Sequence, residues 1–402
     1  MSSTDPFILP FSGRGINYTE EDIQVVADAM RSADPLTQGP KLREFQQMFS
    51  EYQGGIASFA VSSCTAALEL TVMLSNISDG DEVIIPAHTY CSSAIPFARA
   101  GAKIVWADID ENSRVVSAKE IEPLVTGRTK AVVVVHLYGL SAPMDDIMTL
   151  AKERDFLVIE DCAQAVGASY DGKKVGTIGN FGCFSFHAQK NITTLGEGGM
   201  LTVQSREVAE LVPGLRHNGH RPYSGERERY WLPAMVDTDF DIEEVWPLKA
   251  TLGEVQCALG THILTRLDEI SARRNSVARR IIESLRDFPE LSFQSIPSGS
   301  THVYHLLSAR YDGEQFGKTR DDLIDLLANE YRIQAIVQYY PLYRYPMFYR
   351  AGFGEAQCPH TDQFYDNMVS LPFYPWFSDD QFDYLIQSVK GALSALRNTR
   401  SD

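Results

Sequence analysis

Short runs of apolar, mostly β-branched residues recur through the first half of the chain, and each is too short for a long helix. Several of them are apolar at every position, which is typical of strands buried on both faces of a mostly parallel sheet. The last two runs lie close together, so we expect them to pair antiparallel. The pattern predicts seven strands, at Ala57–Val61, Val83–Pro86, Ile104–Ala107, Ala131–Val135, Leu157–Glu160, Phe181–Phe186 and Gly199–Val203.

Segments with helical periodicity separate these runs, for example Thr65–Leu74 and Met144–Arg154. Alternation of strands and helices predicts an α/β layer architecture. Residues 218–248 are rich in Arg, Tyr, Trp, Pro and Asp and have no clear period. A loop of that length in a compact chain is usually functional or contacts a neighbouring subunit.

The remainder of the chain predicts a smaller α+β unit. We expect a long, bent helix over residues 250–287, and the further expected elements are strands at Val303–Arg310 and Ile333–Gln338 and helices near 319–330 and 379–397. We therefore predict a large domain over residues 1–250, including the 218–250 excursion, and a small domain over residues 251–402.

The amino-acid composition and charge disfavour several classes of protein. The 402 residues are 44% hydrophobic and 22% charged, as in ordinary globular proteins. The net charge of −17 disfavours a nucleic-acid partner, which needs a cationic surface. No apolar run approaches the roughly 18 residues of a membrane helix, and Met1–Pro6 lacks the features of a secretory signal. We expect a soluble, cytoplasmic protein without a membrane partner.

The spacing of the cysteines and an incomplete match to a P-loop argue against three further kinds of feature: disulfides, metal sites and a P-loop. The six cysteines show no C-x-x-C pair and no zinc spacing, so we expect neither a disulfide framework nor a metal site. Gly167–Lys174 follows the phosphate-binding P-loop pattern until its last position, where Lys174 replaces the required Ser or Thr. Asp171-Gly172 is a favoured hairpin turn, and we interpret the segment as a hairpin.

Two predicted strands end in residues that carry chemistry. Glu160, Asp161 and Gln164 follow the apolar run Phe156–Ile159, at an edge of the sheet where α/β proteins bind ligands. Lys190 follows the strand that comes next, 29 residues after Asp161. An acid for a ring nitrogen and a lysine for an aldehyde are what pyridoxal phosphate needs. Taken alone, the lysine is more often a surface residue and the aspartate a helix N-cap.

Several stretches of sequence support the same chemistry. The stretch around Lys190 consists of Cys183-Phe184-Ser185-Phe186, Lys190-Asn191 and Gly196-Glu197-Gly198-Gly199. The others are Leu36-Thr37-Gln38-Gly39-Pro40, Ser63-Cys64-Thr65-Ala66-Ala67-Leu68, His136-Leu137-Tyr138-Gly139, Glu160–Gln164, Glu254-Val255-Gln256 and Tyr304-His305-Leu306. Together they resemble, in order, the motifs of the DegT/StrS family of sugar aminotransferases. The resemblance covers about residues 10 to 395. It implies the α/β fold of fold-type I aminotransferases, with a seven-stranded mostly parallel sheet and a smaller C-terminal α+β domain.

The resemblance also implies roles for individual residues. Lys190 would form the Schiff base with pyridoxal 5′-phosphate and move protons. Asp161 would pair with the pyridinium nitrogen, and Gln164 would contact the 3-hydroxyl. Tyr90 would stack on the ring, the alternative being a core tyrosine. His187 lies close to Lys190, but an orienting or core role is expected for it rather than catalysis.

The phosphate cradle would include Cys64, Thr65 and Ser185. Residues 64 and 65 begin a predicted helix, whose N-terminus favours an anion. Cys64 replaces the family's usual glycine, so its contact is expected through the backbone N–H.

Several positions depart from the family pattern. Lys249 stands where the family has an asparagine that reaches the phosphate across a dimer, and it either supplies that contact or is a surface lysine. Family histidines are replaced by Gln338, Tyr343 and Tyr374, which predicts an unusual sugar pocket. Basic residues from Arg216 to Arg229, with His217 and His220, could capture an anionic group of the sugar; alternatively they pair with Glu226, Glu228 and residues 237–244.

These features predict an aminotransferase that converts a keto-sugar to an amino-sugar by ping-pong transfer from L-glutamate or L-glutamine. The leading substrate prediction is an 8-keto octulosonate of lipopolysaccharide, and the alternative is a nucleotide-linked 3- or 4-keto-6-deoxy sugar or a keto-cyclitol. A pyridoxamine-dependent sugar dehydratase would have histidine in place of Lys190. A non-catalytic regulator is disfavoured because Lys190, Asp161 and Gln164 are all present. We expect a homodimer with shared active sites.

Overall fold

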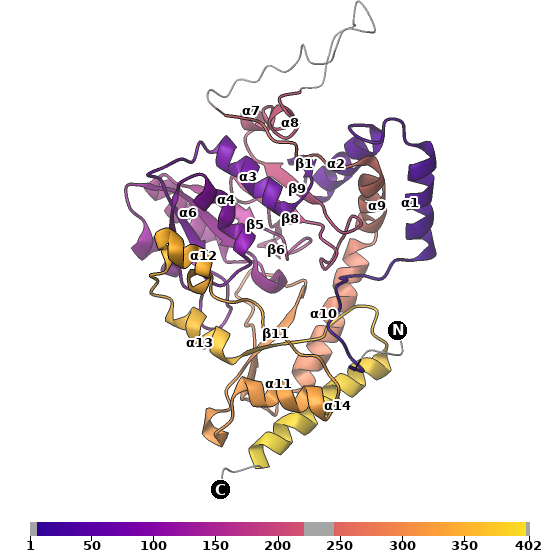
Figure 1. Ribbon diagram of the computed structural model, residues 1–402, viewed down its shortest axis with the longest axis vertical. Helices are drawn as coiled ribbons and strands as arrows, with labels where there is room; N and C mark the ends of the chain where they lie inside the picture. The colour runs from indigo at the N-terminus through magenta and orange to yellow at the C-terminus, as the bar shows by residue number, and fades with distance from the viewer. Residues whose placement is uncertain (1–5, 221–244, 399–402) are drawn as a thin grey trace, which may run out of the picture.

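The computed structural model describes residues 6–220 and 245–398, and all seven expected strands form one sheet (Figure 1). Their order is β1-β9-β8-β5-β4-β2-β3. The strands are β1 (Ala57–Val61), β2 (Glu82–Pro86), β3 (Lys103–Ala107), β4 (Thr129–Val135), β5 (Leu157–Asp161), β8 (Phe181–Ser185) and β9 (Gly199–Val203). Each lies within a residue or two of its expected position, because runs that are apolar throughout can be buried on both faces.

The sheet is parallel apart from one strand. β2 pairs in parallel with β3 and β4, β4 with β5, and β5 with β8. β9 runs antiparallel to both of its neighbours, β8 and β1. The predicted antiparallel pair and the predicted α/β class are therefore confirmed.

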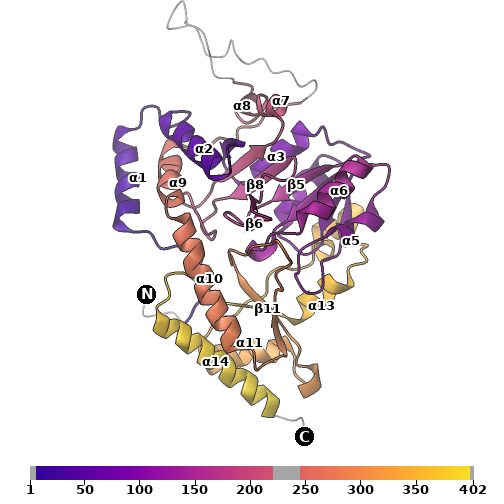
Figure 2. The ribbon, with the colours of Figure 1, turned by 180° about the vertical axis from the view of Figure 1, so that it is seen from behind.

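Helices cover the sheet and connect its strands. α3 (Cys64–Leu74) packs on β8 and β9, α6 (Met144–Arg154) packs on β5, and α2 (Pro40–Tyr52) contacts both β1 and α9 (Glu254–Leu264). α1 (Glu20–Ser32) lies along α9 on its outer side (Figure 2). The shorter helices around the sheet are α4 (Ile95–Arg99), α5 (Ala118–Ile121), α7 (Arg206–Ala209) and α8 (Val212–Leu215).

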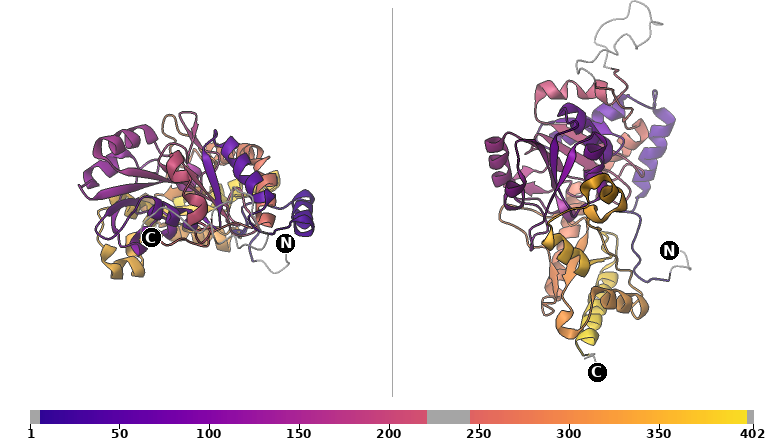
Figure 3. Two further views of the ribbon diagram at one scale, coloured as in Figure 1. Left: turned by 90° about the horizontal axis from the view of Figure 1, so that it is seen from above. Right: turned by 60° about the vertical axis from the view of Figure 1, so that its left-hand side comes forward.

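A second, three-stranded sheet forms below the first. Its order is β10-β11-β12, all antiparallel, and a separate apolar core packs against it. Figure 2 shows α10 descending from the large sheet to this part, where it meets α14, and the right-hand view of Figure 3 shows this part beneath the large sheet. The elements are β10 (Leu291–Phe293), β11 (Leu307–Tyr311), β12 (Met368–Leu371), α10 (Leu267–Ser284), α11 (Arg320–Asn329), α12 (Pro346–Phe348), α13 (Pro359–Asn367) and α14 (Asp379–Asn398). The expected bent helix is thus α9 followed by α10, and the helices expected near 319–330 and 379–397 are α11 and α14.

Of the two strands predicted in this part, one is shorter than expected and the other does not form. β11 begins only at Leu307, because the chain turns sharply at Tyr304, whose φ is +46°. Residues 333–338 form no strand. They make single bridges to two different segments, Leu9 with Ile333 and Ile336 with Ser370, so no continuous ladder can form. The boundary between residues 250 and 251 stays a prediction.

Residues 167–174, which match a P-loop except at the last position, form the expected hairpin. β6 (Ser169–Tyr170) pairs with β7 (Lys173–Lys174), and the turn residues Asp171 and Gly172 have φ values of +44° and +77°. Two successive positive φ values define the mirror-image turn that fits the twist of a hairpin.

Two buried carboxylates fix the ends of elements. Glu254 accepts backbone N–H groups of Gly39, Lys41 and Leu42 at 2.8–3.1 Å, so it caps α2. The contact also links the motif that begins at Leu36 to the motif that begins at Glu254. This contact holds the N-terminal helix pair against α9.

Glu82, at the start of β2, is the second of these carboxylates. It accepts hydrogen bonds from Thr126, Arg128 and Lys103. Burial alone would raise the pKa of Glu82, but these three donors outweigh it and lower the pKa to about 2.

Across the described residues, every helix is too short or too polar to cross a membrane.

Candidate active site

A cavity of about 250 Å³ opens where β1, β5 and β8 end. Seven of the eight predicted site residues line it, and Lys249 is the exception. Its lining is Ser63, Cys64, Thr65, Leu68, Thr89, Tyr90, Ser92, Ser93, Asp161, Ala163, Gln164, Ser185, His187, Gln189, Lys190, Glu197, Gln338 and Tyr339. Residues that are more than a hundred positions apart thus meet at one edge of the sheet, where parallel strands of α/β proteins form ligand sites.

Lys190 sits in a tight loop between β8 and β9. Its backbone N–H bonds the carbonyl of His187 at 2.9 Å, and the adjacent Asn191 donates to the carbonyl of Val303 at 3.1 Å. Gly15 lies so close that a side chain there would collide with the carbonyl of Lys190. Val303 and Gly15 thus hold the backbone of the loop from outside, and the His187 carbonyl holds it from within.

The environment of Lys190 favours its neutral amine. Burial lowers the pKa of Lys190, while Asp161 and Cys64 act in the opposite direction and only partly offset it. A lysine must lose its proton to attack a carbonyl, so a lowered pKa suits a nucleophilic role.

Asp161 is the buried acid of the cavity. Its Oδ2 accepts the hydroxyl of Ser93 at 2.6 Å, and its Oδ1 accepts the N–H of Ala163 at 3.0 Å. The thiol of Cys64 lies 3.9 Å from the same Oδ1. These contacts hold the carboxylate in place inside the cavity, where a ring nitrogen would need an acidic partner.

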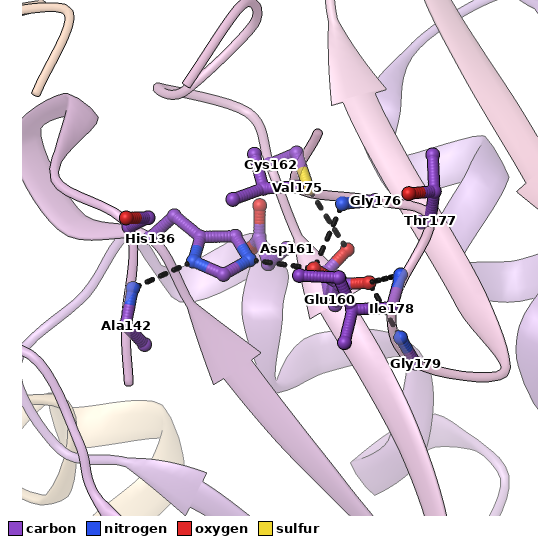
Figure 4. Close-up of polar contacts among 12 residues, drawn as sticks. His136, Ala142, Glu160, Asp161, Cys162, Val175, Gly176, Thr177, Ile178 and Gly179 are labelled. Atoms are coloured by element: carbon purple, nitrogen blue, oxygen red, sulfur yellow. Dashed lines mark hydrogen bonds and ion pairs between the residues drawn. The ribbon is translucent and has the colours of Figure 1, made fainter. Parts of the chain in front are cut away.

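The neighbouring Glu160 faces away from the cavity, because successive side chains of a strand point to opposite faces. Figure 4 shows its carboxylate accepting N–H groups of Gly176, Ile178 and Gly179 at 2.7–2.8 Å and lying 3.0 Å from Nε2 of His136. Nδ1 of His136 in turn accepts the N–H of Ala142. Cys162 lies near this pair, but the oxygens and nitrogens are already hydrogen-bonded. We therefore assign the group a structural role, which is to position β5.

Gln164 and Tyr339 form one wall, and Tyr90 faces them. Oε1 of Gln164 accepts the N–H of Tyr138 at 2.8 Å, which leaves its amide N–H₂ toward the cavity, 3.5 Å from the hydroxyl of Tyr339. Tyr90 stands opposite, with its ring centroid 6.0 Å from that of Tyr339. Tyr90 is 53% exposed, so the alternative that it is a core residue is wrong, and its ring is free to cover a ligand.

The N-terminus of α3 forms the other end of the cavity. Ser63 caps it by accepting the N–H of Ala66 at 3.1 Å, and the N–H groups of Cys64 and Thr65 belong to its first turn. A side chain at Gly199 would lie 2.5 Å from the Ser63 carbonyl carbon, so only glycine lets β9 approach this end. A helix N-terminus with nearby hydroxyls is a favourable site for a phosphate.

These features fit pyridoxal phosphate. The lysine and the acid line one cavity, an aromatic face is open to it, and a helix N-terminus with the hydroxyls of Thr65 and Ser185 lies at its end. Lys190 would hold the aldehyde carbon, Asp161 the ring nitrogen and the α3 end the phosphate. The cofactor, when bound, supplies an electron sink for the reacting carbon.

Sequence reasoning missed part of the lining. Ser93 lies 68 residues from Asp161 in the chain and belongs to no motif that we used, so no local signal revealed it. Tyr339 directly follows Gln338, which was singled out as a departure from the family pattern, but no role was assigned to Tyr339. Glu197 belonged to a recognised motif, although no role was assigned to it. His187 is half-exposed at the cavity, so it is not a core histidine.

The departures from the family pattern fall in different places. Gln338 lines the cavity, but Tyr343 donates to Asp362 and Tyr374 bonds to the backbone of Ser12, and neither reaches it. The expectation of an unusual sugar pocket stays a prediction, and within this chain Gln338 alone of the three lines the cavity.

Only part of the expected basic cluster lies within the described residues. Arg216 is buried and bonds to Gln46 and to the carbonyl of Ala60, so it holds β1 rather than an anion. Lys249 is exposed and lies outside the cavity of its own chain. The acidic and basic residues of 221–244 lie outside the described residues.

Comparisons with known proteins show the family and the fold of this chain. The profile of the DegT/DnrJ/EryC1/StrS aminotransferase family matches residues 17–390. The spore coat polysaccharide biosynthesis protein SpsC of Bacillus subtilis (strain 168) is 36% identical over 386 residues, 96% of each chain. The X-ray structure of an aminotransferase from Psychrobacter cryohalolentis has a TM-score of 0.88 at 26% identity and covers 97% of this chain and 100% of that one. The PMP-form structure of the putative sugar aminotransferase Spr1654 from Streptococcus pneumoniae has a TM-score of 0.85 at 26% identity. It covers 96% of this chain and 99% of that one.

The fold and the site thus define a fold-type I aminotransferase. The chain belongs to the DegT/DnrJ/EryC1/StrS aminotransferase family. It is a pyridoxal phosphate-dependent sugar aminotransferase, as the resemblance in sequence implied.

Proposed function

We propose that this protein transfers an amino group from L-glutamate or L-glutamine to a keto-sugar in two half-reactions. The observation that carries this proposal is the arrangement of Lys190 and Asp161, which project into one cavity from the ends of neighbouring strands. A lysine of lowered pKa can both bind a carbonyl and move a proton between donor and product carbons. One site that serves two substrates in turn gives ping-pong kinetics.

Five residues of the cavity act on the cofactor in this proposal. Lys190 holds the cofactor at rest and carries the proton during transfer. Asp161 stabilises positive charge on the ring nitrogen, and Gln164 donates its amide N–H to the ring hydroxyl. Tyr90 and Tyr339 cover the ring from the mouth of the cavity and exclude water from the reacting carbon.

The open side of the cavity suits a sugar. Gln189, Gln338, Tyr339 and Glu197 offer amide, hydroxyl and carboxylate groups to sugar hydroxyls. Among its lining residues in the described chain, Lys190 is the only lysine or arginine. An acidic sugar such as the 8-keto octulosonate would therefore need a cation from elsewhere, whereas a neutral keto-sugar would not.

We propose that a second copy supplies that cation. Lys249 is exposed beside Trp246, whose side chain is 84% exposed, an unusual position for tryptophan in an isolated chain. A symmetric homodimer would cover this segment and bring Lys249 to the site of the other copy, as the sequence resemblance implied. The 8-keto octulosonate remains our leading substrate, with nucleotide-linked keto-sugars and keto-cyclitols as alternatives and a cytoplasmic location as an expectation.

A panel of keto-sugars tests the proposal. The enzyme, loaded with pyridoxal phosphate and supplied with L-glutamate or L-glutamine, is incubated with octulosonate, nucleotide-linked and cyclitol ketones. We expect mass spectrometry to find exchange of a ketone for an amine in at least one of them. No exchange with any ketone, in a preparation that does deaminate the donor, would contradict a sugar acceptor.

The anion-capture part of the proposal has its own test. We expect Lys249→Ala to raise KM for a carboxylated keto-sugar about tenfold and to leave KM for its neutral analogue unchanged. Equal specificity constants for both sugars, unaffected by salt or by this substitution, would exclude capture of an anion.

A further inference from the structure

A second cavity lies at the opposite end of the large sheet from the cofactor. Its volume is about 740 Å³, and its lining includes Ala57, where β1 begins, and Val203, where β9 ends. The cofactor cavity lies beyond the other end of β1, at Ser63 and Thr65. At about 3.3 Å per residue the strand separates the two cavities by roughly 15 Å. A ligand in the second cavity would therefore not touch the reacting atoms.

Two segments bring positive charge to this cavity. The β6–β7 hairpin contributes Lys173 and Lys174, and the segment after β9 contributes Arg206. The end of α2 and the turn that follows it contribute one acid, Glu51. The lining thus carries three cations against one carboxylate, in a chain whose net charge is −17. Such a local excess of positive charge attracts anions that the rest of the surface repels.

The exposed cations of this cavity are not neutralised by carboxylates. Across residues 6–220 and 245–398, no carboxylate lies within 4.0 Å of Lys173 or of Arg206. Glu51 accepts a hydrogen bond from Gln47 at 3.0 Å and pairs with neither of them. Both cations are exposed and can reach a ligand.

Lys174 is held in place by an aromatic ring. Its Nζ lies 4.3 Å from the ring centroid of Tyr52 and 3.1 Å from its hydroxyl oxygen, and that hydroxyl donates to Asp268 at 2.8 Å. Burial lowers the pKa of Lys174, and Asp268 only partly offsets this. An ammonium that is fixed and partly desolvated interacts more strongly with an anion than a mobile surface lysine does.

We propose that this cavity binds a small polyanion that carries a phosphate or diphosphate group. Three cations match a multiply charged group, whereas a single carboxylate would need only one of them. The volume lies in the range of about 300–1,000 Å³ that small-molecule sites occupy, so there is room for more than the anionic group. The site differs from a P-loop, because the lysines come from a hairpin and not from the start of a helix.

Binding of inorganic diphosphate tests this proposal. The protein is used loaded with pyridoxal phosphate, so that the phosphate end of the cofactor site is filled, and titrated by calorimetry at low and high salt. We expect saturable binding of one diphosphate per chain that weakens as salt rises. Lys173→Glu and Arg206→Glu should each weaken it about tenfold or more, with the absorbance of the bound cofactor unchanged.

Arg350→Glu is the matched control. It reverses one exposed positive charge next to β3, at the opposite edge of the sheet from β1, so the net charge of the protein changes equally. Absence of diphosphate binding in the wild-type protein would overturn the proposal. So would equal weakening in Arg350→Glu, which would indicate a general charge effect. The two test positions lie on separate segments, so misfolding of one variant leaves the other to decide.

Discussion

Replacing Asp161 with asparagine tests the chemistry of the site most directly, because it removes a charge and keeps the size of the side chain. The carboxylate is 5% exposed and accepts two strong hydrogen bonds, from Ser93 and from the N–H of Ala163. An asparagine oxygen can retain one of these contacts, so the fold should tolerate the change. What the variant loses is the negative charge that favours a protonated ring nitrogen.

The size of the effect follows from that lost charge. A hydrogen bond between charged partners contributes about 1.5–3 kcal/mol. At about 1.4 kcal/mol for each tenfold change in rate, the upper end of that range is somewhat more than a hundredfold. Loss of the electron sink adds to this, so we expect kcat of the glutamate half-reaction to fall about a hundredfold or more. The pKa of Lys190 should also fall further, because Asp161 now raises it.

Stopped-flow absorbance of the bound cofactor measures this half-reaction. Ser93→Ala is the matched control, since it removes one hydrogen bond to the same carboxylate and keeps the charge. Loss of about 1 kcal/mol corresponds to a roughly fivefold slower reaction. Circular dichroism and the Tm of both variants check that they fold. If Asp161→Asn turned over within a few-fold of wild type, or no slower than Ser93→Ala, the assignment of Asp161 would be wrong.

Three further predictions concern attachment and stability. Borohydride reduction followed by peptide mapping should place the pyridoxyl group on Lys190, and a label on Lys174 would contradict the site. Because the pKa of Glu82 is lowered from 4.5 to about 2 in the folded state, its stabilisation is complete above its unfolded pKa and is lost as pH falls toward 2. Glu82→Gln should therefore cost about 3 kcal/mol near neutral pH and little at pH ~2, measured by urea unfolding; a pH-independent cost would refute this. Glu254→Ala should lower the free energy of unfolding by about 3 kcal/mol, since it leaves buried N–H groups of α2 unpaired, and a change below about 0.5 kcal/mol would show that the cap is dispensable.

The large sheet could be predicted because its signal is local. Each strand is an apolar run bounded by polar turns, and burial on both faces requires no knowledge of the partners. The small domain was less predictable. Residues 303–306 and 333–338 have the composition of strands, but their backbone groups bond elsewhere: the carbonyl of Tyr304 accepts Arg274, and Ile336 pairs with Ser370 alone. Contacts from distant segments overrode the local preference.

The active site shows the same division. The sequence by itself determined the kind of chemistry, because Lys190, Asp161 and Gln164 lie in motifs whose residue types and order are legible along the chain. Only the tertiary structure decided which other groups meet them: Ser93 on Asp161, Tyr339 opposite Tyr90, and Gln338 but not Tyr343 or Tyr374 at the cavity. The physical reason is that a side chain's identity is a local property, whereas its neighbours are set by how distant segments pack.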